Sequence, residues 1–178
     1  MALKITDRLI GDHKTFRKMS GDIDAIVKSP PAQRDVRRLI RLVELFKDHL
    51  VVHAWFEDRY FYPELRRALT RGAPSEITPA YMDHLDHEHK TVDGYVDRLE
   101  REVKGVPPSF GWPQTFALLF HGLKSHMRKE EEELFPAADA LLGSERLEAL
   151  SVEMERHRSE APRIRAHASE EGPASPFA

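Results

Sequence analysis

Cysteine is absent from the 178 residues of this chain. Disulfide bonds and thiolate chemistry are therefore excluded, and any metal ion has to be held by imidazole, carboxylate or phenolate groups. The chain does contain 10 histidines. Histidine side chains are therefore available as metal ligands in place of cysteine.

Long apolar runs and a strong charge of either sign are missing as well. No segment approaches the roughly 20 apolar residues that cross a bilayer, and residues 1–10 lack the pattern of a signal peptide. The formal net charge is only -3, so electrostatics give no reason to expect a nucleic acid or an acidic membrane as a partner. We expect a cytoplasmic location, and the sequence leaves open which protein partner, if any, the chain has.

Four segments carry apolar residues at helical spacing, and prolines and glycines interrupt the pattern between them. They cover residues 3–28, 33–70, 76–104 and 113–142. Short loops between long amphipathic helices are typical of an all-α, antiparallel up-down-up-down four-helix bundle, which is the predicted fold class. Pro63 should kink the second helix just after Glu57.

The length indicates one domain followed by a short tail. A break at Gly143 and Ser144 precedes apolar residues at positions 147, 150 and 154, which predict an additional C-terminal helix. The expected boundaries are a bundle over 1–142 made of two helix-pair repeats (3–70 and 76–142), the C-terminal helix over 143–169, and a disordered tail over 170–178.

A His-x-x-x-Glu motif occurs twice, each time with a proline six residues after the glutamate. Residues four apart lie on the same face of a helix. An acidic-His pair also recurs, because the five residues that start at Asp12 match the five that start at Glu88 without a gap. The chain is therefore interpreted as an internal duplication, whose repeated motifs are His53 to Glu57 and His126 to Glu130, preceded by His13 and His89.

These six repeated residues occupy apolar helix faces at similar depths in the predicted bundle. Unpaired carboxylates buried there would be costly, so a cation is expected to satisfy them. Imidazole and carboxylate ligands suit iron or manganese. We favour two iron ions bridged by Glu57 and Glu130, with positions left for an oxo or hydroxo bridge and a small ligand; the predicted ligands are His13, His53, Glu57, His89, His126 and Glu130.

On these motifs the chain resembles the hemerythrin-like proteins, which have an HHE cation-binding domain. The matching residues are Asp12-His13, His53-x-x-x-Glu57 with Phe61-Tyr62-Pro63, Glu88-His89, and His126-x-x-x-Glu130 with Leu134-Phe135-Pro136. The resemblance implies a four-helix bundle with a non-haem di-iron site. In that family such sites serve oxygen carriage, oxygen or redox sensing, iron handling, and reactions with peroxide or nitric oxide.

The sequence departs from the oxygen carriers of that family. They have a histidine four residues before the one that matches His89, where this chain has Leu85. Their last carboxylate is an aspartate five residues after its histidine, whereas here it is Glu130, four residues after His126. A missing imidazole leaves the site more open or filled by another side chain, which argues against simple reversible oxygen storage. Further candidates for direct ligation, or for a hydrogen bond at the site, are Tyr60, Glu133 and His84; the remaining acidic residues after Glu130 are interpreted as a solvated run.

The predicted function is a non-haem di-iron protein that binds or reacts with a small oxidant, namely peroxide, dioxygen or nitric oxide. Peroxide breakdown, a catalase-like disproportionation, is the favoured chemistry, and the sequence leaves open whether the chain is an enzyme and which residues are catalytic. The alternative is a non-catalytic oxygen or iron sensor, or an iron-binding module. A ferritin-like bundle is disfavoured because its Glu-x-x-His pairs have the reverse order.

Overall fold

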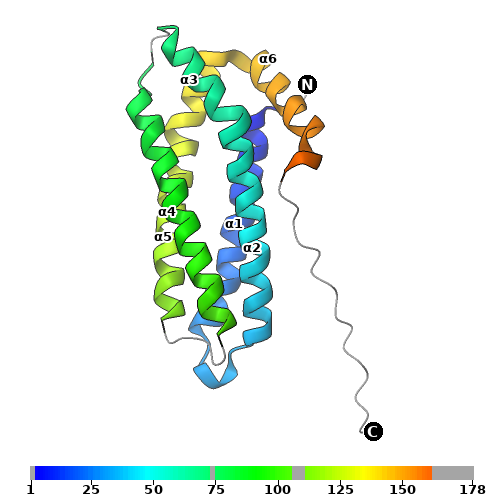
Figure 1. The fold of residues 1–178 in the computed structure, drawn as a ribbon, viewed down its shortest axis with the longest axis vertical. Coiled ribbons are helices and arrows are strands. Elements are labelled where there is room, and N and C mark those ends of the chain that lie inside the picture. The colour runs from blue at the N-terminus through cyan, green and yellow to red at the C-terminus, as the bar shows by residue number, and fades with distance from the viewer. Residues whose placement is uncertain (1–2, 73–74, 106–110, 162–178) are drawn as a thin grey trace.

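Four long helices form an antiparallel bundle in the computed structural model, which describes residues 3–72, 75–105 and 111–161 (Figure 1). These helices are α1 (Ile5–Lys28), α2 (Val36–Phe56), α4 (Pro79–Lys104) and α5 (Trp112–Lys129). Helix α1 packs on α2, α2 on α4, α4 on α5, and α5 again on α1. Neighbours in the bundle follow one another along the chain, so the predicted up-down-up-down fold is confirmed.

Two side-chain caps set the starts of α2 and α4. Asp35 accepts a hydrogen bond from the backbone amide of Arg38, and Thr78 accepts one from that of Tyr81. Both are favourable N-cap residues, because they satisfy an amide that has no partner within the helix. Helix α2 starts a few residues later than the sequence pattern predicts, since Pro31–Gln33 forms a separate 3-10 turn, η1.

The chain passes through one π-helical turn in each half of the bundle. Glu57–Phe61 forms the turn η2 before α3 (Tyr62–Thr70), and Glu130–Leu134 forms η3 before α6 (Phe135–Arg156). A proline follows each turn at the second position of the next helix, where it lacks an amide proton and would clash with the carbonyl of the preceding α-helical turn. The wider π turn accommodates this conflict, so the kink expected at Pro63 takes the form of a five-residue turn.

The core consists of two apolar clusters with a polar layer between them. His13 illustrates the arrangement, because Phe16 on one side of it belongs to the cluster nearer the η1 end and Leu9 on the other belongs to the cluster nearer α6. Helices α2 and α4 show the same order around their own buried histidines, and after α5 the second cluster begins at Leu134 of η3. The polar layer is therefore shielded from solvent along the bundle axis on both sides.

Helix α6 changes direction at Gly143, whose backbone angles are φ 73° and ψ 161°. After this break α6 crosses the end of the bundle (Figure 1), where Leu147, Leu150 and Met154 are buried against the second apolar cluster. A 3-10 turn, η4 (Arg158–Glu160), follows. The remainder of the expected C-terminal helix, and the tail predicted over 170–178, lie outside the described residues.

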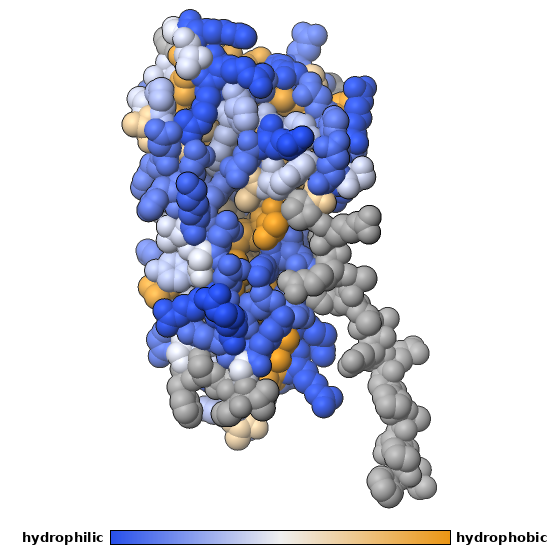
Figure 2. Space-filling view, in the orientation of Figure 1, coloured by the Kyte–Doolittle hydropathy of each residue, from blue (hydrophilic) through white to orange (hydrophobic). Residues whose placement is uncertain are grey.

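The surface is predominantly hydrophilic on the face that Figure 2 shows. Large apolar side chains with substantial exposure are scattered over the chain and do not share a helix: Leu3, Val36, Leu118 and Val152. Among the helices of the described residues, none combines the length and the apolar character that a membrane crossing requires.

Replacing Gly143 with alanine should destabilise the protein, because φ 73° with ψ 161° is a backbone conformation that is essentially restricted to glycine. We expect a loss of about 1 to 3 kcal/mol in the free energy of unfolding, measured by urea denaturation. Gly94→Ala is the matched control, since an added Cβ meets nothing within 4 Å there. That control should gain about 0.5 to 1 kcal/mol, and an unchanged stability in Gly143→Ala would contradict the account.

Candidate metal centre

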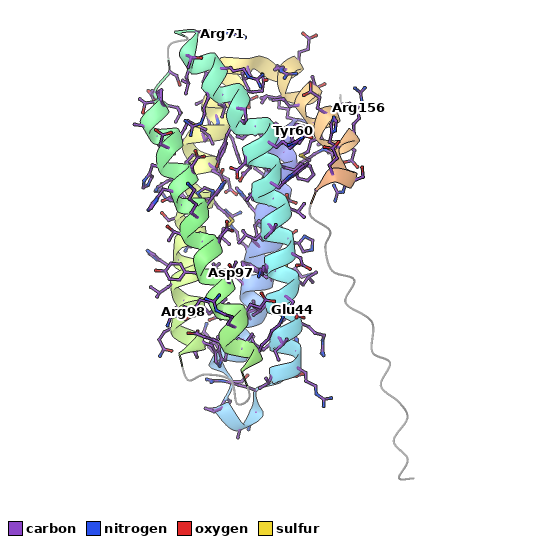
Figure 3. The ribbon with its side chains drawn as sticks, in the orientation of Figure 1. Glu44, Tyr60, Arg71, Asp97, Arg98 and Arg156 are labelled. Atoms are coloured by element: carbon purple, nitrogen blue, oxygen red, sulfur yellow. The ribbon has the colours of Figure 1, made fainter. Side chains whose placement is uncertain are left out.

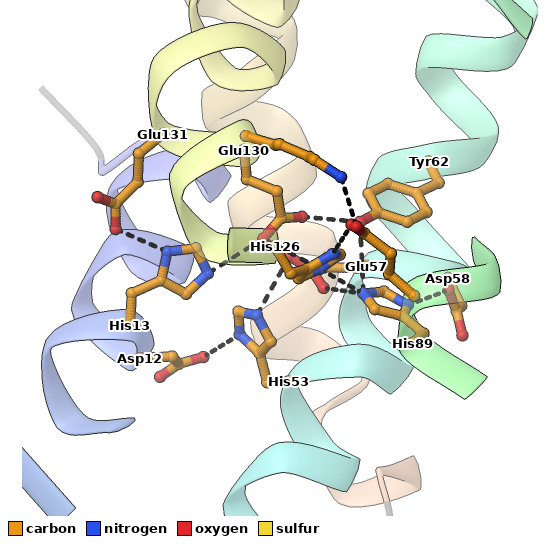
Figure 4. A network of polar contacts seen from close by, with 12 residues as sticks. Asp12, His13, His53, Glu57, Asp58, Tyr62, His89, His126, Glu130 and Glu131 are labelled. Carbon is orange, nitrogen blue, oxygen red and sulfur yellow. Dashed lines mark hydrogen bonds and ion pairs between the residues drawn. The ribbon is translucent and has the colours of Figure 1, made fainter. Parts of the chain in front are cut away.

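One histidine from each bundle helix enters the polar layer (Figure 4). His13 comes from α1, His53 from α2, His89 from α4 and His126 from α5, and all four are buried. Each histidine occupies a position of an apolar helix face, which is why the helical fold brings all four to the bundle axis. Their Nε2 atoms converge, with those of His89 and His126 only 2.9 Å apart.

Two glutamates with no exposed surface complete the layer, and each is the first residue of a π turn. Glu57 directs Oε1 to within 3.2 Å of His53 Nε2 and Oε2 to within 3.2 Å of His89 Nε2. Its two oxygens therefore face the two halves of the chain. Glu130 instead directs one oxygen at both halves, because its Oε2 lies 3.2 Å from His13 Nε2 and 3.3 Å from His126 Nε2.

The layer contains two potential cation sites that share both glutamates. Within each site every residue offers one donor atom, and these atoms lie within 4.8 Å of one another. One site comprises His13, His53, Glu57 and Glu130, and the other comprises His89, His126, Glu57 and Glu130.

Unsatisfied polar atoms indicate that the layer fits a metal. Both carboxylate oxygens of Glu57, Oε2 of Glu130 and Nε2 of His13 are buried without a hydrogen-bond partner. Buried polar atoms are nearly always paired, and an unpaired carboxylate in an apolar interior is costly. A donor set of imidazole nitrogen and carboxylate oxygen suits iron or manganese. The residues present therefore fit the metal that the sequence led us to expect.

An outer ring of four carboxylates fixes the four imidazoles. Each Nδ1 lies 2.8 to 3.3 Å from an acidic side chain, in the pairs His13 with Glu131, His53 with Asp12, His89 with Asp58, and His126 with Glu88. Because Nδ1 shares its proton with the outer carboxylate, Nε2 is the nitrogen left to bind a cation. This arrangement is the one that metal-binding histidines almost always have.

The outer carboxylates follow a sequence rule that the motif analysis used only in part. Asp12 and Glu88 are the acidic residues of the acidic-His pairs, whereas Asp58 and Glu131 each follow a glutamate of the polar layer directly. The sequence pattern predicts no role for Asp58, and it predicts Glu131 as part of a solvated run. The signal that could have identified them is the repetition of an acidic residue at the same place in both motifs.

Tyr62 makes the two halves of the centre unequal. Its hydroxyl donates a hydrogen bond of 2.7 Å to Glu130 Oε1, and its ring stacks on that of His89 with centroids 5.4 Å apart. The equivalent residue in the second repeat is Phe135, which stacks on His13 but has no hydroxyl. Tyr62 therefore explains why Glu130, unlike Glu57, directs a single oxygen at the histidines.

Tyr60 does not reach the polar layer, which corrects the expectation that it lies beside the metal. Its ring packs against those of Trp55, Phe56 and His157, toward the part of α6 that crosses the bundle end (Figure 3). The π turn is the physical reason. The amide of Tyr62 bonds to the carbonyl of Glu57, so the residue five positions after Glu57, and not the one three positions after it, returns to the same face.

Glu133 and His84, the other two candidates, belong to neither potential cation site. Glu133 is exposed and lies 3.8 Å from a guanidinium nitrogen of Arg128. His84 is 55% exposed, and its Nε2 is 3.2 Å from Glu88 Oε1. His84 thus contacts the outer carboxylate of His126, while the metal-facing atoms lie elsewhere.

The buried acids and bases strongly perturb one another. Burial disfavours the charged ring of His53, but the carboxylates of Glu57 and Asp12 outweigh it and raise its pKa to about 10. Burial also opposes the charge of His89, yet Asp58 and Glu57 raise its pKa to about 11. Burial favours a protonated Glu57, whereas His53 and His89 hold its pKa well below the usual range. Without metal, the protonated rings of His53 and His89 therefore offset the negative charge of Glu57.

Metal binding should release protons at neutral pH. Without metal, His53 and His89 are charged at pH 7, because their pKa values of about 10 and 11 lie above it. Binding through Nε2 requires the neutral ring, so about two protons leave as the centre fills, and affinity for a divalent cation rises with pH. Calorimetric titration with Mn²⁺ in buffers of different protonation enthalpy measures this number.

The free energy of unfolding of the metal-free protein should fall as the pH rises, whereas metal affinity rises. The raised histidine pKa values contribute stability that is fully present below about pH 6.5, the usual histidine value, and is lost as the pH rises through about 10. A titration that releases no protons, or an affinity that falls between pH 6 and pH 8, would contradict the assignment of these two rings as ligands.

Comparison with known proteins identifies the family to which this chain belongs. The model of the hemerythrin HHE cation binding domain matches residues 4–138, a range that contains the four histidines, both glutamates and the outer carboxylates. Searches of curated proteins and of solved structures return no significant match. The matched domain covers most of the chain, and the chain therefore belongs to the hemerythrin HHE cation-binding domain family.

Proposed function

We propose that this chain is a non-haem di-iron protein that breaks down hydrogen peroxide. The observation that carries the proposal is the orientation of Glu57, whose two oxygens face two different histidine pairs. A carboxylate in that orientation can serve one ion on each side, and the two potential sites share it. The proposed ligands are His13, His53, Glu57, His89, His126 and Glu130, and two iron ions are the proposed cofactor.

Bound iron would supply two adjacent one-electron redox centres with positions left for a small oxidant. The protein's own residues would set the conditions around them. The two inner carboxylates offset the positive charge of the ions, and the four outer carboxylates hold the imidazoles in one orientation and raise their basicity. Both effects are built into helices rather than loops, so the donor atoms are positioned before any ligand arrives.

The apolar surroundings favour a small reactant. A cavity of about 10 Å³ borders three of the histidines, and its other walls include Leu50, Val92 and Leu123. A space of that size is about what one water-sized molecule needs. Peroxide, dioxygen or nitric oxide meets this restriction, whereas an organic substrate of several carbon atoms exceeds it.

Tyr62 is proposed to keep its proton during the reaction. Burial and the neighbouring carboxylates of Glu130 and Glu57 hold its pKa well above the usual range. The phenol is therefore a lasting donor to Glu130 Oε1 at 2.7 Å, and it leaves Oε2 for the metal. In this proposal Tyr62 positions Glu130 and is not itself a ligand.

Iron-loaded protein should release oxygen repeatedly when hydrogen peroxide is added, as measured with an oxygen electrode. His126→Ala should lose both the bound iron and the oxygen release, because the substitution removes a donor from one site. His121→Ala is the matched control, since His121 lies on the same helix but is exposed to solvent. The control should retain the iron content and the rate of the unsubstituted protein.

A single stoichiometric colour change without continued oxygen release would contradict the enzymatic proposal. That result, with iron still bound, would favour the alternative in which the chain is an oxygen or iron sensor, or an iron-binding module. Failure to bind iron at all, with Mn²⁺ bound in its place, would contradict the choice of metal.

A further inference from the structure

The internal duplication provides a comparison between the two flanks of the centre. His13 and His89 are equivalent in the two repeats, so Arg17 and Asp93, each four residues later on the same helix, are equivalent as well. The outer carboxylates next to them, Glu131 and Asp58, also correspond. One difference between the two flanks is thus a reversal of charge, from Arg17 to Asp93.

On the first flank Arg17 binds the outer carboxylate of the histidine. Its guanidinium donates hydrogen bonds of 2.9 and 2.8 Å to the two oxygens of Glu131, and Glu131 in turn accepts one of 2.8 Å from His13 Nδ1. The side chain of His13 is 0% exposed, so this flank is closed.

On the second flank no equivalent bridge is available, because Asp93 and Asp58 both carry carboxylates. The side chain of His89 is 10% exposed, and a cavity of about 360 Å³ opens beside it. The cavity is lined by two members of the centre, by Pro63 and by five charged residues: Asp58, Tyr62, Pro63, Arg66, Asp86, His89, Lys90 and Asp93. The cavity therefore connects the protein surface to His89 and Tyr62.

This cavity adjoins the interior space beside the histidines. The small cavity that borders His53, His89 and His126 is also lined by Asp93. His89 and Asp93 are thus common to the outer and the inner cavity. Two other cavities of the described residues are larger than the inner one, at about 250 and 600 Å³, but neither is lined by any of the six proposed ligands.

We propose that the outer cavity, here called the Asp93 port, is the route by which a small reactant reaches the centre, and that Asp93 determines which reactants enter. Three aspartates, at positions 58, 86 and 93, outnumber the two cationic residues of its lining, Arg66 and Lys90, and Arg66 is paired with Asp86 at 2.6 Å. An excess of negative charge disfavours anions. The port thus selects uncharged molecules such as hydrogen peroxide or nitric oxide. This inference rests on the proposed iron centre.

The test uses nitric oxide binding to the ferrous protein, followed by stopped-flow absorbance. Asp93→Arg copies the residue of the closed flank and should slow nitric oxide association about tenfold or more. Gly94→Arg is the control, because it adds the same side chain one residue further along the helix, where a Cβ meets nothing within 4 Å. The control should bind nitric oxide at the rate of the unsubstituted protein.

A second variant separates charge from blockage. Asp93→Asn keeps the size of the side chain and removes its charge, so it should raise the rate of azide binding to the ferric protein more than it changes the rate of nitric oxide binding. The difference should shrink at high salt, since screening weakens the repulsion that the carboxylate exerts.

Iron content and the optical spectrum are measured first for every variant. If iron-loaded Asp93→Arg binds nitric oxide as fast as the unsubstituted protein, the proposed role of the Asp93 port is wrong, whereas the proposed iron centre is not affected. Equal slowing in Gly94→Arg would also overturn that role, because the effect would then be unspecific. If the unsubstituted protein takes up no iron, the proposed function fails and the port fails with it.

Discussion

Two carboxylates buried at the centre of an apolar bundle are the constraint on which this structure depends. Glu57 and Glu130 have no exposed surface, and three of their four oxygens lack a hydrogen-bond donor. An interior of that kind does not tolerate free negative charge. Four imidazoles, four outer carboxylates and the protons or metal ions between them satisfy the requirement, while apolar clusters on both sides keep water away.

The fold and the inner residues could be predicted because each leaves a periodic signal in the sequence. Helical spacing of apolar residues indicates the four helices, and the repeated His-x-x-x-Glu motif distinguishes six polar residues from ordinary core histidines. Tyr62 could not be placed in the same way. A π turn adds a residue to the turn after Glu57, and that change of phase is invisible to a pattern with a period of 3.6. Asp58 and Glu131 were missed because charged residues on a helix usually face solvent.

The duplication provides a symmetric scaffold, and its exceptions give the two halves different roles. Tyr62 and Phe135 occupy equivalent positions in the two repeats, so one half has a hydrogen bond to Glu130 that the other half lacks. Asp93 and Arg17 also occupy equivalent positions, and one flank has a cavity where the other has an ion pair. The repeated motif thus accounts for two similar groups of donor residues, and the exceptions are the basis of the proposed approach of a reactant from one side.

The central claim is that two metal ions lie between Glu57 and Glu130, one beside each histidine pair. Anomalous diffraction from crystals of the iron-loaded protein, recorded on both sides of the iron absorption edge, tests it most directly. The account predicts two iron peaks in the polar layer, one adjoining His13 and His53 and the other adjoining His89 and His126. A single peak, or iron bound outside this layer, would contradict it.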